Sequence, residues 1–517
     1  MKRALAGLLL LCASCGGAST PPVTPTQPTG STPPQTGGPD PWGVPDSPRE
    51  DDVSAPAPGP IQLGAWKAAA TAKVVAAPET CKGWATRAGA SATDLASALT
   101  ETDATKRDAR LVTVGKAANK AMLVAALRAD LAPIECADVI TDPEITKMKE
   151  GGAGAIVHTL VGLSLASKLA RTAASPPTMA AETDKEKVKA FVKGPLATWM
   201  VAEAKAIETL SAGASGLHGY GRGLAALEAG VADLRLVDKI RSAPTPASWD
   251  AELKQVYEAA LDEALEPRKR RGRDAALVGL GDFAREGVID DPRVRRARQM
   301  ISKLYGGRRI DALDGLLLPP ITASTGPSAF WMNAVPEVAT DLARGYPQNA
   351  RAKTRVDPKA GASADARARL DLGRLYWRKV DFVEASQIAR HGKDPGDRLV
   401  LAVSLALARG GAKSAADMMS APTPAKLDLS HTAALDALAA EGGPLAGMAA
   451  FDAAHLRALS PPEGDASAYF KDVAARFKKA AQLLSGESKQ LAESRAADAD
   501  TAARIGHPDG PPGGGGS

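Results

Sequence analysis

Alanine is the feature that most constrains this chain, because it makes up about a fifth of the 517 residues. Alanine has the highest intrinsic helix propensity. The aromatic residues that favour strands amount to only 4%, while hydrophobic residues reach 44% and charged residues 24%. Such a composition can bury large cores and is unlike that of a disordered chain. We therefore expect an all-α fold of antiparallel helical hairpins, stacked as an α-solenoid.

The start of the chain has the pattern of a targeting segment. Lys2 and Arg3 supply positive charge, 4–11 form a short apolar run, and small residues follow. A helix needs about 20 apolar residues to cross a bilayer, so this run is too short to span one. The pattern therefore predicts export.

The sequence Cys-Ala-Ser-Cys at 12–15 resembles the lipobox of bacterial lipoproteins, although leucine is usual where Cys12 stands. The resemblance implies that 1–15 is a lipoprotein signal peptide and that Cys15 is acylated, which would attach the protein to a membrane. An ordinary secretory cleavage near Ala18 is the alternative.

Residues 16–60 hold thirteen prolines among Gly, Ser, Thr and acidic residues, with almost nothing apolar. This segment cannot bury a core, and we expect a disordered, extended tether between the anchor and the folded body. A disordered segment without a spacing role is the alternative. Gly16 follows the proposed anchor in place of an acidic residue, and by resemblance to enterobacterial sorting this implies the outer membrane of the cell envelope.

Two cysteines remain in the predicted mature chain, Cys81 and Cys136. An even pair in an oxidising compartment can form one disulfide that ties the first helices together. Two separate buried thiols are the alternative, because the sequence does not place their Cα atoms within bonding range.

The rest of the chain divides by composition into four parts. We expect an Ala-rich α-helical domain at 61–318, an irregular connector at 319–364, helical repeats at 365–484, and a helix end with a disordered Gly-rich tail at 485–517. Aromatic residues in the connector, Trp331 among them, predict that it packs on the body.

Some helix boundaries can be predicted in the first domain. Apolar residues at helical spacing follow Ser248 and predict a helix that ends before Pro267. Similar stretches run over 108–131, 155–171, 185–211 and 222–240. The glycine-rich run Gly-Leu-His-Gly-Tyr-Gly-Arg-Gly at 216–223 has no strand before it, which favours a flexible loop between helices over a nucleotide-binding loop.

The 365–484 block resembles a degenerate array of about three tetratricopeptide repeats. Small residues are needed where two helices cross closely, and larger ones fill the gaps between hairpins. No unit carries the whole pattern, and a generic helical bundle is the alternative. The residues that carry the resemblance are Leu372, Gly373, Tyr376, Phe382, Ala385, Phe451 and Ala454. A helix at 469–484 is expected to seal the array.

Catalytic and metal-binding motifs do not emerge from the sequence, and we predict neither an enzyme nor a cofactor or metal. The six histidines lie at least 24 residues apart, so no helix carries two on one face. Asp452 and His455 stand at i and i+3, but a surface pair or a partly buried helix residue is favoured over a metal site.

Positive charge is concentrated at 268–309, where thirteen Lys and Arg accompany five Asp and Glu. Two clusters on neighbouring helices could merge into one basic face for anionic lipid, lipopolysaccharide phosphates or an acidic partner. Nucleic acid is not expected, since no aromatic residue is interleaved with the arginines. A solvated face balanced by acidic residues elsewhere is the alternative. The clusters are Arg268, Lys269, Arg270, Arg271 and Arg273, then Arg293, Arg295, Arg296 and Arg298.

These patterns favour a lipid-anchored helical-repeat scaffold that binds protein or peptide partners in the bacterial cell envelope. One alternative is an envelope-polymer hydrolase whose carboxylates the spacing does not pair, which would need a deep pocket with converging acids. Another is a passive structural spacer, whose surface would carry charges of both signs and no exposed apolar strip.

Overall fold

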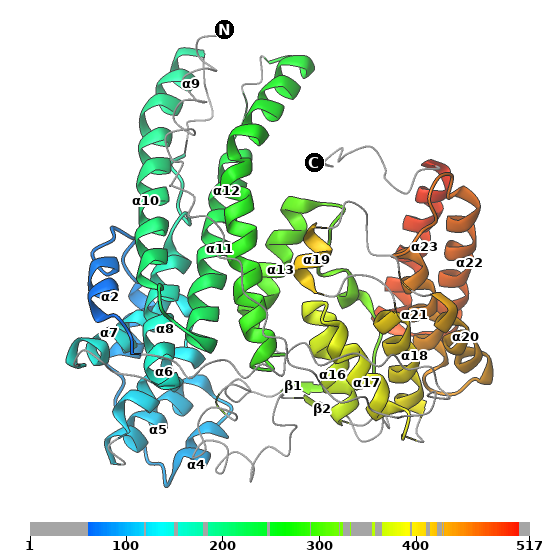
Figure 1. Cartoon of the computed structure of the whole chain (residues 1–517), viewed down its shortest axis with the longest axis horizontal. Coiled ribbons are helices and arrows are strands. Elements are labelled where there is room, and N and C mark those ends of the chain that lie inside the picture. The colour runs from blue at the N-terminus through cyan, green and yellow to red at the C-terminus, as the bar shows by residue number, and fades with distance from the viewer. Residues whose placement is uncertain are drawn as a thin grey trace, which may run out of the picture.

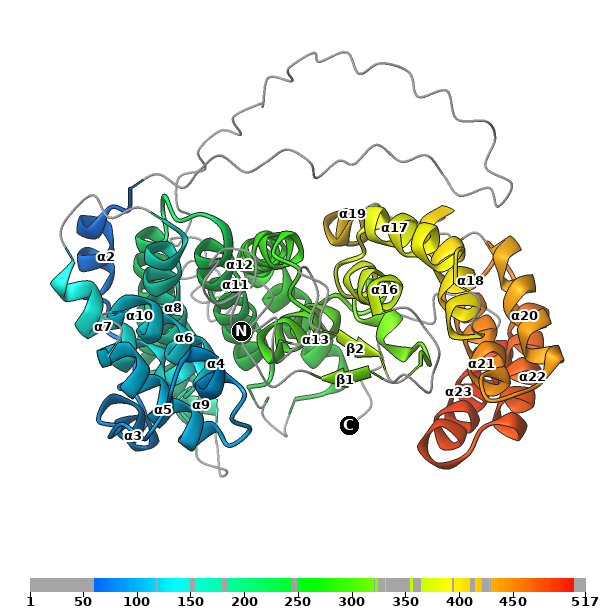
Figure 2. The same ribbon diagram turned by 90° about the horizontal axis from the view of Figure 1, so that it is seen from below.

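The computed structural model is all-α, and its helices follow chain order from one end of the molecule to the other (Figures 1 and 2). The signal segment, Cys15 and the tether lie outside the described residues, as does the Gly-rich tail. None of the described helices has an apolar stretch long enough to span a bilayer. The structure describes 60–117, 120–148, 154–178, 185–243, 245, 249–289, 291–319, 321–323, 331, 354–356, 364–392, 395–409, 414–420, 427 and 429–505.

The first block contains helices of very different length and four short turns. The helices are α2 (Leu63–Ala69), α3 (Lys82–Ala85), α4 (Leu95–Leu99), α5 (Ala104–Ala117), α6 (Ala121–Leu131), α7 (Ala137–Lys147), α8 (Ala155–Arg171), α9 (Lys185–Phe191), α10 (Ala197–Gly213), α11 (Gly219–Arg241), α12 (Ala251–Arg285) and α13 (Pro292–Tyr305). Three of these turns are 3₁₀-helical, η1 (Glu79–Cys81), η2 (Ile134–Cys136) and η4 (Ala312–Gly315), and the fourth is a π-helical turn, η3 (Val192–Leu196), which joins α9 to α10.

The second block begins after a two-stranded antiparallel ribbon in the connector, with Ile321 opposite Val356. The ribbon strands are β1 (Ile321–Ala323) and β2 (Thr354–Val356). The elements of the second block are α16 (Ala364–Tyr376), α17 (Lys379–Ala389), α18 (Pro395–Arg409), α19 (Ala415–Ser420), η6 (Leu429–His431), α20 (Thr432–Glu441), α21 (Ala446–Ala458), α22 (Ser467–Leu483) and α23 (Gly486–Ile505).

Local sequence explains where several helices begin. The carboxylate of Asp94 accepts from the backbone N–H of Ser97 and completes a capping box at the start of α4. Asp291 caps α13, where Pro292 occupies a position whose N–H would have no partner in the helix. The 108–131 stretch, predicted as one helical segment, is two helices, because α5 ends at Ala117 and α6 begins at Ala121.

Helix α8 is the centre of the first block, since nearly all its side chains are buried. It contacts α6, α7, α10 and α11, and α2 packs on α10 far along the chain. Glycine lets α8 and α11 approach closely. A Cβ on Gly162 would lie 2.2 Å from the carbonyl oxygen of Gly221, and a Cβ on Gly221 would lie 2.1 Å from that of His158.

The glycine-rich run at 216–223 is therefore not a flexible loop, and this prediction was wrong. Gly219, Gly221 and Gly223 all belong to the first turns of α11. Their lack of a side chain serves helix packing: a Cβ on Gly223 would meet the ring of Phe283 on α12 at 3.0 Å.

The prediction that a helix ends before Pro267 was also wrong, because α12 runs through this residue to Arg285. Proline leaves one carbonyl of the preceding turn without its helical donor. Pro267 is exposed, so water can reach that turn. Close packing on α11 holds the rest of the helix: a Cβ on Gly230 would lie 2.5 Å from the carbonyl oxygen of Gly272.

Most helices of the second block pack on the next helix, from α16 on α17 to α22 on α23, but α18 packs on α20, past the short α19 between them. The prediction that the helix at 469–484 seals this row was wrong. The 20-residue α23 follows α22 and buries Ala492 and Ala496. One continuous apolar core runs from Ile61 to Leu456 and joins both blocks. A second, smaller core lies between α21, α22 and α23.

Candidate functional site

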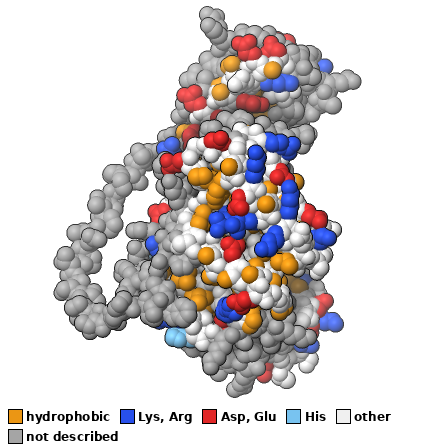
Figure 3. All heavy atoms as spheres, turned by 90° about the vertical axis from the view of Figure 1, so that its right-hand side faces the viewer, with side chains coloured by type: hydrophobic (Ala, Val, Ile, Leu, Met, Phe, Trp, Pro, Cys, Tyr) orange, Lys and Arg blue, Asp and Glu red, His pale blue; other side chains and the backbone are white. Residues whose placement is uncertain are grey.

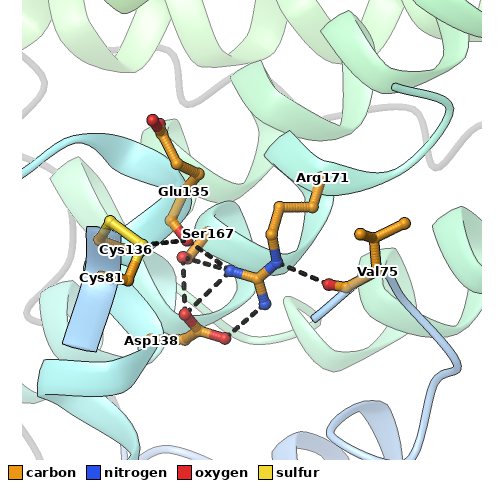
Figure 4. The surroundings of a disulfide bond; sticks show 7 residues. All are labelled: Val75, Cys81, Glu135, Cys136, Asp138, Ser167 and Arg171. Atoms are coloured by element: carbon orange, nitrogen blue, oxygen red, sulfur yellow. Dashed lines mark hydrogen bonds and ion pairs between the residues drawn. A yellow bond between two sulfur atoms is a disulfide. The ribbon is translucent and has the colours of Figure 1, made fainter. Parts of the chain in front are cut away.

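Cys81 and Cys136 form a disulfide, so the even pair predicted from the sequence is a bonded pair in this structure. Figure 4 shows its surroundings, in which the guanidinium of Arg171 lies at the centre. Arg171 donates to the backbone carbonyls of Val75 and Glu135, at 2.9 and 2.6 Å. The disulfide and Arg171 together tie the segment before η1 to α7 and α8.

A buried carboxylate completes this brace. Asp138 accepts two hydrogen bonds from Arg171, at 3.0 and 2.6 Å, and one from Ser167. Although burial opposes ionisation, these donors and Lys168 lower the pKa of Asp138. The hydrogen bonds of Asp138 with Arg171 and Ser167 thus join α7 to α8.

The first basic cluster of the sequence is largely used inside the molecule. Asp233 of α11 is buried and accepts from Arg268 at 2.6 Å and from Arg271 at 2.7 Å. Lys269 lies over the ring of Tyr305, 4.5 Å from its centroid, and Arg273 lies over the same ring. These contacts fasten α12 to α11 and α13. Arg270, the most exposed side chain of the cluster, lies 3.9 Å from Glu266.

The second basic cluster does not merge with the first into one exposed face, which was one of the two alternatives considered from the sequence. Arg298 is completely buried, where it donates to Asp314 at 2.8 Å and to the carbonyl of Ile310 at 3.0 Å. Arg293 is also buried, and Arg296 pairs with the buried Glu228 of α11. Arg295 is exposed. A buried arginine needs an acidic partner. Glu228 and Asp130, two of these partners, lie outside the 268–309 segment over which the charges were counted.

Asp130 of α6 organises a junction that sequence reasoning missed. Its buried carboxylate accepts from Arg293 at 3.0 Å, from the hydroxyl of Tyr220 at 2.9 Å and from Nε1–H of Trp331 at 2.8 Å. Trp331 is completely buried, so the expectation that the connector packs on the body is confirmed at this residue. Of the residues in this junction, Trp331 was the one that the sequence analysis used, as an aromatic residue that predicted packing of the connector.

The residues named for the tetratricopeptide resemblance lie in buried, closely packed positions. A Cβ on Gly373 would lie 2.5 Å from the ring of Phe382, so α16 and α17 cross closely there. Leu372 and Ala385 are buried in the main core, and Ala454 in the second. Phe451 of α21 packs against α22, with its ring centroid 5.2 Å from that of Phe477.

Three consecutive residues, starting with the last residue of α16, join the two blocks. The hydroxyl of Tyr376 donates to the carbonyl of Val288 at 2.6 Å, Nε1–H of Trp377 to that of Ile310 at 2.7 Å, and Arg378 to that of Ala284 at 2.8 Å. Tyr376 therefore bridges to the first block instead of only filling a gap between hairpins.

Asp452 and His455 are buried, not a surface pair. Asp452 accepts from the backbone N–H of Leu317 at 2.7 Å, and Nε2 of His455 lies 3.0 Å from the carbonyl oxygen of Ala312. Burial raises the pKa of Asp452 well above its usual range and lowers that of His455 to about 4. The His455 ring is therefore neutral near pH 7, and both side chains hold the 312–317 segment on α21.

Raised carboxyl pKa values also occur elsewhere. Burial, with Asp282 nearby, raises the pKa of Glu286 to about 7. Burial raises the pKa of Asp381 to about 6, against the pull of Arg378 and Arg369. Among the described residues, no three His, Cys, Asp or Glu side chains gather closely enough to hold a metal ion.

The outer face of the second block carries charges of both signs, with hydrophobic side chains scattered between them (Figure 3). Leu483 and Ile505 are the large hydrophobic residues exposed on the described helices of this block, at 49% and 53%. Such isolated residues form no contiguous apolar strip.

No protein-family model, curated protein or solved structure matches this chain. The class that the structure itself defines is an all-α protein whose buried arginines and acids brace helices against each other.

Proposed function

We propose that this protein is a lipid-anchored scaffold of the bacterial cell envelope, which binds a protein or peptide partner through its helical faces. The observation that carries the scaffold role is the row of helices α16, α17, α18, α20, α21, α22 and α23, in which each helix packs on the next one named. Such rows present long, continuous surfaces to partners. The tetratricopeptide-like spacing of Gly373, Phe382 and Ala385 supports the same role.

The Cys81–Cys136 disulfide supports export, since disulfides persist in oxidising compartments and are rare where thiols are kept reduced. Anchoring through Cys15 and residence in the outer membrane are proposed on the targeting segment and the Pro-rich tether. A contact of Arg270 and other exposed basic side chains with anionic lipid or lipopolysaccharide belongs to the same proposal.

Membrane fractionation tests the anchor. Cys15→Ala should move the protein from the membrane to the soluble fraction, with helical content by circular dichroism unchanged. Cys12→Ala is the matched control and should stay with the membrane. Equal membrane recovery of both variants would contradict acylation at Cys15.

Photo-crosslinking in living cells tests the scaffold role. A crosslinking residue in place of exposed Lys471 or Lys479 on α22 should capture one discrete envelope protein, and the same residue at Lys147 on α7 should not. Equal, diffuse labelling from all three positions would argue against a partner-binding row.

A passive spacer is the second candidate, and the mixed charges on the outer face of the second block favour it (Figure 3). A spacer needs reach and solubility but no partner. Deleting α16–α23 would then leave the location of every envelope protein unchanged, whereas loss of a scaffold would displace its partner.

A further inference from the structure

Two helical arms project from one end of the first block, beyond the end of α11 (Figure 1). Helix α11 ends at Arg241, whose Nε lies 3.1 Å from Oδ1 of Asp262 on the antiparallel α12. Residues 251–261 of α12 therefore extend past α11 by about 16 Å, at a rise of 1.5 Å per residue. The other arm consists of α9, the η3 turn and the first half of α10.

Both arms lack the burial of the helices that they extend. Of the described side chains at 186–203, Leu196 is the buried one, and α10 becomes regularly buried only from Ala204. Val201 on this arm is 49% exposed and Val256 on α12 is 52% exposed. Large hydrophobic residues are exposed at few other described positions.

The arms carry opposite charge. The basic arm, 186–205, holds four lysines and two glutamates; the acidic arm, 249–263, holds five acids and one lysine. On the acidic arm, Glu252, Val256 and Glu263 are exposed at i, i+4 and i+11, which places them on one face of α12. On the basic arm, Val201 and Lys205 stand at i and i+4, both exposed.

We propose that the arms are a self-association surface, in which the basic arm of one copy packs against the acidic arm of a second copy. The geometry favours this occupant. The two arms project from the body in the same direction (Figure 1), so a two-fold rotation about an axis perpendicular to both arms reverses their direction and exchanges their positions. Each basic arm then lies antiparallel to the acidic arm of the other copy, and the contact is made twice.

Charge complementarity sets the pairing, because like arms repel and unlike arms attract. The exposed Val201 and Val256 add apolar area at the same contact. Since these charges are exposed, the association should weaken as salt rises and the Debye length falls. The proposal is independent of the lipid anchor and of any partner of α16–α23.

Disulfide trapping between two differently tagged full-length copies tests the contact directly. One copy carries Val201→Cys and the other Val256→Cys, so a bond between the tags reports only on two molecules. We expect a covalent dimer from this pair. The matched control, Val75→Cys with Leu483→Cys, has the same exposure, 49% at each residue, and should stay monomeric.

Charge reversal tests the cause of the pairing. Lys189→Glu, Lys193→Glu and Lys205→Glu together should cut the trapped dimer at least tenfold, and adding Glu252→Lys, Glu258→Lys and Glu263→Lys to the same chain should restore it. Reversing the exposed Lys471, Lys479 and Lys489 on α22 and α23 controls for net charge. Circular dichroism confirms folding of each variant.

The proposal is overturned if the Val201→Cys and Val256→Cys copies yield no more dimer than the control pair. It is equally overturned if charge reversal leaves trapping unchanged, or if the arms trap a different protein and the chain sediments as a monomer at low salt.

Discussion

The hydroxyl of Tyr376 donates a hydrogen bond of 2.6 Å to the carbonyl oxygen of Val288, 88 residues earlier in the chain. This contact joins the end of α16 to the turn between α12 and α13. Trp377 and Arg378 donate to two further backbone carbonyls of the first block. Since all three acceptors are backbone atoms, the link depends on the path of the first block and not on its side chains.

Tyr376→Phe should lower the free energy of unfolding by about 1–3 kcal/mol, because it leaves a buried carbonyl without its donor. Within the part of the chain that the structure describes, the removed hydroxyl makes no other hydrogen bond, so the loss measures this contact between the blocks. Urea denaturation followed by circular dichroism checks the value. Tyr257→Phe, on the acidic arm, is the control and should change stability by less than about 0.5 kcal/mol.

Reducing the Cys81–Cys136 disulfide should lower stability by about 4 kcal/mol, the chain-entropy value for closing a loop of 55 residues. Unfolding is compared with and without a thiol reductant. Cys81→Ser should reproduce the loss and abolish the response to reductant. A reductant effect of equal size in that variant would show that the wild-type response comes from elsewhere.

Gly221→Ala should destabilise the protein by about 1–3 kcal/mol or more, because the new Cβ would meet the backbone of α8 and force α11 away. The matched substitution is Gly281→Ala on α12, where the nearest atom lies 3.9 Å from the new Cβ. This variant should gain up to about 1 kcal/mol from helix propensity. Thermal unfolding of both variants separates tight packing from propensity, and losses of similar size would refute the packing argument.

Glu286→Gln should flatten the pH dependence of stability. Burial raises the pKa of Glu286 from 4.5 to about 7. The unfolded chain therefore releases this proton first as pH rises. The free energy of unfolding falls progressively from about pH 4.5 to about pH 7 and stays lower above that range. At pH 8 the glutamine variant should exceed wild type by roughly 2–3 kcal/mol, with no gain at pH 4.

Urea titrations at both pH values check this prediction, with the exposed Glu258→Gln as the control. A gain of the same size at pH 4 would mean that the amide stabilises by packing, not by removing a titrating carboxyl.

The buried charge network explains why the two basic clusters do not form one exposed face. The arginines at 268–298 were visible as a charge excess, but their acids, Asp233, Glu228 and Asp130, lie on α11 and α6. A count along the chain assigns no partner to an arginine, because the partner is chosen by helix packing. For the same reason the sequence did not predict the role of Asp130, whose partners lie on distant segments of the chain.

Local chemistry by itself determined much of this protein. Alanine excess and the scarcity of aromatic residues predicted the all-α fold, which the structure has, and α8 (Ala155–Arg171) has the predicted bounds. These properties depend on propensity and periodicity over a few turns, which a sequence carries. The lipobox-like Cys15 and the tetratricopeptide-like spacing remain predictions.

Tertiary structure alone decided which residues meet. It carried α12 through Pro267, placed Gly219, Gly221 and Gly223 inside a helix, and turned an expected basic surface into internal braces. In each case long-range packing outweighed a local preference: a close glycine contact, or a buried acid opposite an arginine, contributes more than the propensity of one residue.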